Sequence, residues 1–244
     1  MRLIFRFKVQ LSFACLACAP LVSHGEITAF RERNVERDMM VRTQIEAPPD
    51  RRAIQDSRVL SAMRRVPRHA FVPESLQARA YDDNPLPIGY AQTISQPYIV
   101  AFMTELLEIS SGMKVLEVGT GSGYQAALLA ELTPLVCSIE VIEALAERAA
   151  KVIKELGYGS VRLKRGDGFN GWKDEAPFDR IMLTFAAEEV PPPLWEQLKP
   201  GGIMVAPLGR AYSSQKLYKL RKLPDGRMER RAVLDVAFVP QIRE

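Results

Sequence analysis

The feature that most constrains the fold is a regular alternation of strand and helix patterns after residue 97. Short apolar runs typical of buried strands alternate with helical stretches or with Gly- and Pro-rich turns. This alternation is typical of a doubly wound α/β fold, a mostly parallel sheet with helices on both faces. The last two strands flank Pro224-Asp225-Gly226, so we expect them to be antiparallel. The expected strands are 114–118, 135–139, 161–164, 180–184, 203–207, 216–222 and 232–238, and the expected helices are 98–108, 124–132, 143–156 and 194–198.

Residues 26–97 have a different pattern. Apolar residues recur at helix spacing between charges over 26–65, and Ala47-Pro48-Pro49-Asp50 divides this stretch into two helices. Residues 66–97 are rich in Pro, Gly and Asp, so we expect loops there. We expect 26–97 to form one compact domain with 98–244.

The first 25 residues are unlike the rest. Arg2, Arg6 and Lys8 precede an apolar run from Val9 to Val22, and small residues precede a candidate cleavage after Gly25. This is the layout of a secretory signal peptide, with a disordered extension as the alternative. The run is too short for a comfortable membrane span.

The charge distribution excludes some classes of function. Residues 1–80 carry a net charge of +6, whereas residues 81–244 carry −2. Binding of nucleic acid requires a clustered basic face, and the later part of the chain offers none. The two histidines, His24 and His69, argue against a His-built metal site, and we expect no metal. We expect Asp82-Asp83 to be a solvated loop.

A glycine-rich turn within VLEVGTGSGY, residues 115–124, indicates a ligand site at the end of the first core strand. Dinucleotide sites usually show G-x-G-x-x-G, but here the third glycine comes one residue early. Glu117 would repel a pyrophosphate and suits a ligand that carries ammonium and sulfonium charges. The turn therefore favours S-adenosylmethionine over a nicotinamide cofactor, and a purely structural turn is the alternative. The expected contacts from this turn are Glu117, Gly119, Thr120, Gly121 and Gly123.

Two further acids follow the next two strands. Glu140 lies 21 residues after Gly119, where a carboxylate can accept the two ribose hydroxyls. Asp167 can accept a hydrogen bond from the adenine amino group, with Gly168 leaving room for the base. The alternatives are an ordinary charge near a helix start and an ordinary loop aspartate. Trp172 is a candidate for stacking on adenine or for the core.

Several stretches, in order over about residues 35–242, resemble the protein-L-isoaspartate O-methyltransferase family. They are RVPRHAFVP at 65–73, LPIGYAQTISQP at 86–97, VLEVGTGSGYQAALLA at 115–130, GDG at 166–168, APFDRIML at 176–183, QLKPGGIMVAPLG at 197–209 and FVP at 238–240.

The resemblance implies a Rossmann-like S-adenosylmethionine methyltransferase sheet with an N-terminal helical extension and a C-terminal antiparallel strand pair. It implies methylation of the free α-carboxyl of L-isoaspartyl residues in damaged proteins and peptides, and the ester then forms a succinimide that reopens partly to aspartate. We expect a monomer without stable membrane association. S-adenosylmethionine is made in the cytosol, so we expect the cytoplasm, with the periplasm as the alternative if residues 1–25 are cleaved.

By this resemblance, Ser95 is the active-site serine, and Thr93, Ile94, Val239 and Pro240 frame the acceptor peptide. An α-carboxyl group has a pKa of about 3.3–3.7, so it is ionised at neutral pH and needs no general base. We therefore expect Ser95 to orient the carboxylate, although it is also well placed to cap the helix that starts near Pro97. We expect His69 to serve in packing or in a loop contact.

One loop departs from the family. Phe185 and the paired acids Glu188 and Glu189 are unusual after the fourth strand, and the acids should disfavour acidic residues beside the damaged site. Three other functions remain as alternatives: methyl transfer to a small molecule or RNA, nicotinamide-dependent oxidoreduction, and ligand binding without turnover.

Overall fold

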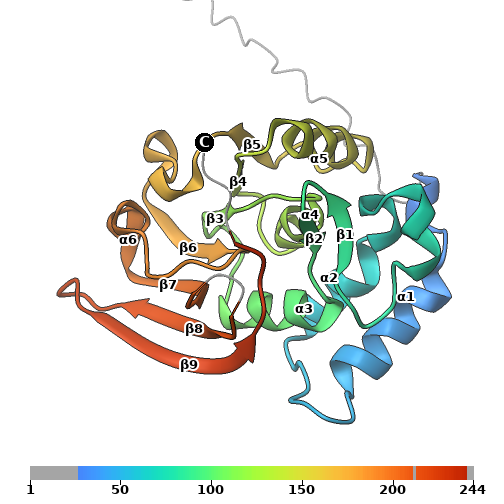
Figure 1. The fold of residues 1–244 in the computed structure, drawn as a ribbon, viewed down its shortest axis with the longest axis horizontal. Coiled ribbons are helices and arrows are strands. Elements are labelled where there is room, and N and C mark those ends of the chain that lie inside the picture. Colours follow the sequence, from blue (N-terminus) through green and yellow to red (C-terminus); the bar gives the residue numbers. More distant parts are fainter. Residues whose placement is uncertain (1–26, 211–212, 241–244) are drawn as a thin grey trace, which may run out of the picture.

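The computed structural model describes residues 27–210 and 213–240, so the expected signal peptide or extension lies outside the described residues. Its centre is a seven-stranded sheet in the order β5-β4-β3-β6-β7-β8-β9 (Figure 1). Strands β3 to β7 are parallel, and β8 and β9 continue the sheet in antiparallel pairs. The mostly parallel sheet and its antiparallel C-terminal pair are confirmed. The strands are β3 (Val115–Val118), β4 (Val136–Glu140), β5 (Arg162–Arg165), β6 (Phe178–Leu183), β7 (Leu198–Leu208), β8 (Gln215–Lys222) and β9 (Met228–Val236).

The helices begin and end largely where the sequence pattern predicts. The Asp56 side chain caps the start of α2 by accepting a hydrogen bond from Arg58 N at 2.9 Å. Gly157, with φ +78°, follows α5 in the left-handed conformation that ends many helices. The helices are α1 (Asn34–Met40), α2 (Ser57–Arg65), α3 (Pro97–Leu106), α4 (Tyr124–Ala130), α5 (Glu143–Glu155) and α6 (Pro192–Gln197). Helix α1 continues as a π-helix over Val41–Glu46.

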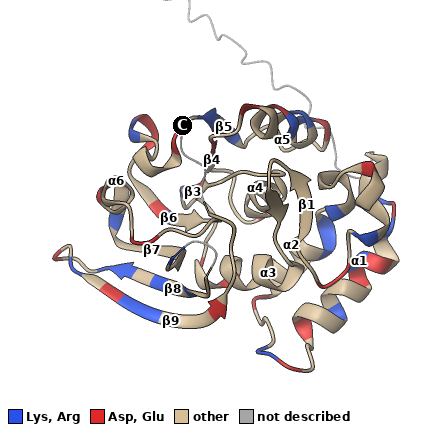
Figure 2. Ribbon diagram, viewed as in Figure 1, with Lys and Arg blue, Asp and Glu red and all other residues tan. Residues whose placement is uncertain are grey.

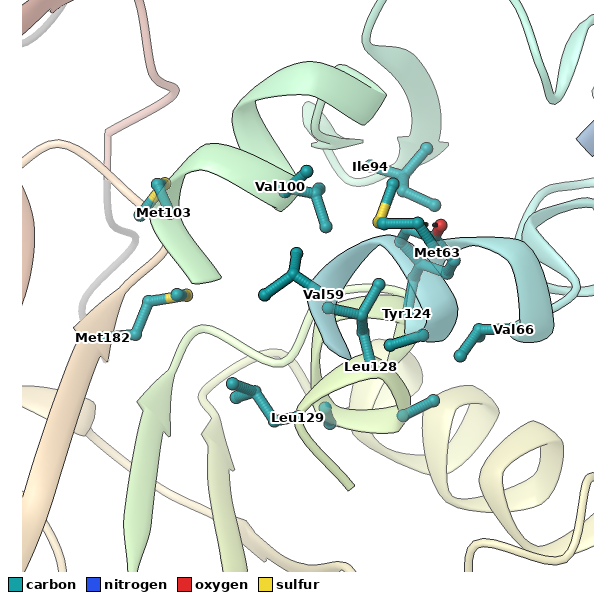
Figure 3. Close-up of a cluster of buried hydrophobic side chains, with 14 of the residues drawn as sticks. Val59, Met63, Val66, Ile94, Val100, Met103, Tyr124, Leu128, Leu129 and Met182 are labelled. Carbon is teal, nitrogen blue, oxygen red and sulfur yellow. Dashed lines mark hydrogen bonds between the residues drawn. The ribbon is translucent and has the colours of Figure 1, made fainter. Parts of the chain in front are cut away.

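The two faces of the sheet pack into two apolar clusters. On β3, Val115 belongs to one cluster and Leu116 to the other, because alternate strand residues point to opposite faces. The first cluster also holds Val59 and Met63 of α2 and Leu128 of α4 (Figure 3). The N-terminal helices therefore share a core with the sheet.

The expectation of loops over residues 66–97 was wrong in part. This stretch contains the short 3-10 helices η4 (Arg68–Phe71) and η5 (Glu74–Arg79) and a hairpin of β1 (Leu86–Gly89) and β2 (Gln92–Ile94). The two residues between these strands, Tyr90 and Ala91, both have positive φ, 54° and 55°. Turns of that geometry usually have Asn or Gly at the two central positions, and neither is present here, so the hairpin could not be predicted from its turn residues.

Two strand boundaries also differ from the expectation. β7 begins at Leu198, because Pro200-Gly201-Gly202 lies in an irregular stretch inside the strand and does not precede it. β9 begins at Met228 directly after the turn and ends at Val236, so Phe238 lies beyond the strand. No helix in the described part of the chain is long and apolar enough to cross a bilayer.

Candidate active site

A pocket of about 810 Å³, measured out to its open mouth, lies at the carboxyl ends of β3, β4 and β6. The chain leaves β3 for β4 on one side, and β6 pairs with the other side of β3. Ligands in doubly wound sheets bind at such a reversal of strand order. The wall is formed mainly by residues 92–95, 117–122 and 139–142, together with Val100, Met103, Tyr124, Gln125, Gly168, Thr184, Phe185, Phe238 and Val239.

Glu117 is the fully buried acid of this pocket. Its Oε2 accepts a hydrogen bond from Ser138 Oγ at 2.6 Å, and Ser138 Oγ lies 2.6 Å from Thr120 Oγ1. Its Oε1 is buried and has no hydrogen-bond partner among the described residues. The pKa of Glu117 is raised to about 8, mainly by burial; the hydrogen bond from Ser138 lowers it, and the neighbouring Glu140 carboxylate raises it. A buried oxygen without a partner is costly, so the pocket wall suits a ligand that brings a donor, such as an ammonium group.

The three glycines of the turn have different roles. Gly119 has φ +99°, and a Cβ there would lie 2.3 Å from Thr184 Oγ1. Gly121 has φ +55°, and its N–H donates to Glu140 Oε2 at 2.7 Å. Gly123, with φ +89°, precedes α4 and lies against α5, where a Cβ would meet side chains at 3.1–3.3 Å. Gly119 and Gly121 line the pocket, whereas Gly123 does not and serves helix packing.

The two other acids are placed differently from each other. Glu140 lines the pocket, and its carboxylate accepts from the N–H groups of Gly121 and Ile142 at 2.7 and 2.9 Å. Each oxygen keeps a further lone pair for a ligand hydroxyl. The Asp167 carboxylate instead accepts from Phe169 N at 2.9 Å and caps a short 3-10 turn, while its neighbour Gly168 lines the pocket. The structure therefore places Asp167 beside the pocket wall and not on it.

The residues expected to frame an acceptor come together at the same pocket. Thr93, Ile94, Ser95 and Val239 line it, whereas Pro240 forms a bridge to the segment after β6. The alternative reading of Ser95 as a helix cap is wrong, because α3 has its N-cap one residue later and no side chain caps it.

Two residues at or behind the pocket wall have roles that the sequence did not predict. Ser138 is fully buried inside β4, where its place in an apolar run gives no hint of a polar role. Phe185, which the sequence analysis noted only as unusual for the family after the fourth strand, is 4% exposed and forms part of the pocket wall, with its ring 5.9 Å from that of Phe169.

Other polar candidates lie away from the pocket. His69 Nδ1 is 2.7 Å from Tyr81 Oη in a buried contact, and burial lowers the pKa of His69, so it has the packing role we expected. Trp172 packs against the second apolar cluster and is not among the lining residues. Asp83 pairs with Arg51. Over residues 27–210 and 213–240, no group of three His, Cys, Asp or Glu side chains is placed to hold a metal.

Comparisons of the sequence with known proteins all match one family. The family model "Protein-L-isoaspartate(D-aspartate) O-methyltransferase (PCMT)" matches residues 40–244. A Syntrophobacter fumaroxidans protein named protein-L-isoaspartate O-methyltransferase 2 is 59% identical over 185 residues, 76% of this chain and 75% of its own. The protein-L-isoaspartate O-methyltransferase of Opitutus terrae is 52% identical over 236 residues, 97% of this chain and 99% of its own.

Solved structures agree with the sequence matches. One protein-L-isoaspartate O-methyltransferase superposes with a TM-score of 0.71 at 29% identity. That match covers 77% of this chain and 62% of the other, so this chain spans less than two thirds of that protein. A Plasmodium falciparum structure described as a beta-aspartate methyltransferase, in complex with S-adenosyl-L-homocysteine, superposes with a TM-score of 0.68 at 25% identity. The match covers 78% of this chain and 93% of that one.

Proposed function

Because the chain belongs to the protein-L-isoaspartate(D-aspartate) O-methyltransferase family, we propose that it methylates the free α-carboxyl of L-isoaspartyl residues in damaged proteins and peptides. The methyl ester then closes to a succinimide, which reopens partly to normal aspartate and so repairs the backbone. The observation that carries the proposal is the shared pocket. It joins the half-satisfied carboxylate of Glu117 to the segment Thr93–Ser95.

The pocket fits S-adenosylmethionine as the methyl donor, which supplies a methyl group on an already activated sulfonium. The free oxygen of Glu117 suits the ammonium group of the donor. Gly119 lines the pocket with backbone alone, and a side chain there would collide with Thr184 Oγ1. Glu140 is the candidate partner for the ribose hydroxyls, and Asp167 and Gly168 are the candidates for adenine.

The acceptor side needs alignment more than acid–base chemistry. An isoaspartyl α-carboxyl with a pKa of about 3.3–3.7 is an anion at neutral pH, so no base has to ionise it. His69 is held by Tyr81 away from the pocket, which agrees with a reaction that needs no imidazole. Ser95 can donate a hydrogen bond that fixes the attacking oxygen, and correct alignment can contribute up to ~7–11 kcal/mol. Thr93 and Val239 frame the peptide on the same wall.

Methyl transfer to matched peptides tests the proposal. Labelled S-adenosylmethionine is offered to two peptides that differ only in Asp or isoAsp, and we expect a base-labile ester on the isoAsp peptide alone. Ser95→Ala should slow transfer roughly 10- to 100-fold while S-adenosylhomocysteine binds as before. Ser111→Ala, at an exposed turn, is the control and should change neither. Equal transfer to both peptides, or donor binding without transfer to either, would point to another acceptor or to a binding module.

We also propose that the protein acts as a monomer in the cytoplasm, where its methyl donor is made. Cleavage after Gly25 with export to the periplasm is the alternative. Mass spectrometry of the N-terminus of protein from cell fractions separates the two, and sedimentation of the purified protein tests the monomer.

A further inference from the structure

We infer that Ser138 is a positioning residue for the methyl donor: together with Thr120 it forms a chain of hydroxyl groups that holds Glu117 with one oxygen free for the donor's ammonium group. This inference rests on the proposed function, in which that ammonium group meets Glu117. Ser138 itself lies outside the pocket wall and acts only through Glu117.

The chain of hydroxyls follows from strand register. Glu117 of β3 and Ser138 of β4 are directly paired in the parallel ladder, so both side chains leave the sheet on the same face. Ser138 Oγ is 2.6 Å from Glu117 Oε2 and 2.6 Å from Thr120 Oγ1. Thr120 follows β3 by two residues and lies on the pocket wall. The three side chains are buried, with exposed fractions of 0% for Glu117 and Ser138 and 4% for Thr120.

The direction of the two hydrogen bonds follows once Glu117 is paired with an ammonium group. Glu117 is then ionised and only accepts, so Ser138 must give its single hydroxyl proton to Glu117. Its oxygen can then only accept from the second neighbour, so Thr120 must donate to Ser138. The chain therefore runs one way, from Thr120 through Ser138 to Glu117.

This arrangement decides which carboxylate oxygen faces the ligand. With Oε2 of Glu117 engaged, the buried Oε1 is left without a partner. Without Ser138 the carboxylate would lose its only donor among the described residues, and with it its fixed orientation. We expect the loss of one hydrogen bond to a charged group to weaken donor binding roughly 10- to 100-fold.

The hydroxyl chain also makes Glu117 easier to ionise. Burial and the Glu140 carboxylate raise the pKa of Glu117, and the hydrogen bond from Ser138 lowers it, which leaves the pKa at about 8. The acid is therefore largely protonated at neutral pH in the ligand-free protein, and removal of the Ser138 hydroxyl should raise its pKa further, so that loss of the proton opposes the binding of an ammonium group more strongly. In Ser138→Ala, the affinity for an ammonium ligand should therefore reach its maximum at a higher pH than in the unmodified protein.

Two nucleosides distinguish a positioning role of Ser138 from general damage to the protein. S-adenosylhomocysteine carries the amino-acid ammonium group, whereas 5′-methylthioadenosine lacks it. For Ser138→Ala at pH 7.5, calorimetric titration should show a 10- to 100-fold loss for S-adenosylhomocysteine and less than a twofold change for methylthioadenosine. Ser138→Thr keeps a hydroxyl and should recover most of the affinity. Thr120→Val, which removes only the outer donor, should lose several-fold.

Cys137→Ala is the matched control, because Cys137 is buried one position earlier on β4 but points to the opposite face. It should leave the ratio of the two affinities unchanged. Equal weakening of both nucleosides in Ser138→Ala, or the same loss in Cys137→Ala, would overturn the inference. A parent protein that binds S-adenosylhomocysteine but methylates no isoAsp peptide would remove the proposed acceptor and leave the role of Ser138 standing.

Discussion

The Glu117 carboxylate is fully buried at the end of β3, and one of its oxygens has no hydrogen-bond partner in the described part of the chain. Its pKa is raised from 4.5 to about 8, so the folded protein holds a proton that the unfolded chain releases between these values. The stability that comes from this proton is fully present below about pH 4.5 and is lost as the pH rises through about 8. A group that we propose binds the methyl donor thus lowers the stability of the ligand-free protein at neutral and alkaline pH.

We therefore expect Glu117→Gln to stabilise the ligand-free protein at high pH. The amide has the same shape and no charge to desolvate. At pH 8.5 the gain should be about 2 kcal/mol, or roughly 4–8 °C in Tm. At pH 5 the two proteins should melt together, because the acid is then already protonated in the folded state. Calorimetry at both pH values measures this, and the variant should also lose protection by S-adenosylhomocysteine. A Tm difference that is the same at both pH values would contradict the explanation.

For individual residues, the sequence predicted which ones lie together at the pocket, but not which contacts each side chain makes. Glu117, Glu140 and Gly168 could be predicted because parallel strands all end at one edge of the sheet. Ser138 could not, because its contact with Glu117 depends on the register between two strands. The inward or outward direction of a side chain, which separates Glu140 from Asp167, is likewise set by loop geometry that spacing does not reveal.

The β1–β2 hairpin carries the proposed acceptor residues on a strained turn. Tyr90 and Ala91 both adopt left-handed backbone angles, which cost an L-residue roughly 1–2 kcal/mol each. Ser95 follows the hairpin directly. Arg148 of α5 donates to the carbonyl of Ile88 and so ties the hairpin to the core.

We expect Ala91→Gly to stabilise the protein by ~0.5–1 kcal/mol, or about 2 °C, because glycine adopts the left-handed angles without strain. Ala150→Gly is the matched control on the exposed face of α5 and should destabilise by about 1 kcal/mol. Thermal melting of both variants without ligand gives the comparison. A loss of stability in both would show that the angle at Ala91 is not strained.

The larger strands and helices could be predicted from the sequence, whereas the β1–β2 hairpin could not, and each outcome has a physical reason. Strands such as β3, buried on both faces, appear in the sequence as short apolar runs. In the helices between them, apolar residues recur every three or four positions. The β1–β2 hairpin has neither signal, since its turn lacks Asn and Gly at the two central positions. Its shape is imposed by the packing of Leu86, Ile88 and Ile94 into the first core.

Charge is unevenly divided over the whole molecule. Residues 81–214 hold 11 Lys and Arg against 17 Asp and Glu, a net charge of −6, whereas 215–236 hold 7 against 3, a net of +4. Figure 2 shows the basic residues along β8 and β9. Glu188 and Glu189 are exposed in the segment that follows the pocket residues Thr184 and Phe185. We therefore expect a substrate peptide at this pocket to meet a negative rim formed by Glu188 and Glu189.

We expect isoAsp peptides with lysine neighbours to be methylated with a higher kcat/KM than peptides with glutamate neighbours. Two charges ~10 Å apart in water interact by about 0.4 kcal/mol, so each rim acid should contribute roughly twofold. The double change Glu188→Gln and Glu189→Gln should reduce the preference, and 0.5 M salt should largely remove it. Glu147→Gln, exposed on α5, is the control and should keep it. A preference unaffected by both changes would place its origin elsewhere.

β9 is the last strand of the described sheet, and within the described residues no strand pairs with its outer edge. Such an edge is a template for pairing with another polypeptide, and charged side chains are a common protection. Arg230 and Arg231 are exposed, and as neighbours on a strand they project to opposite faces. Two molecules meeting edge to edge would therefore bring like charges together on either face.

Replacement of both Arg230 and Arg231 by threonine should turn a dispersed protein into one that self-associates as its concentration rises, which light scattering measures. Colloidal solubility thus depends on two side chains that lie outside the pocket.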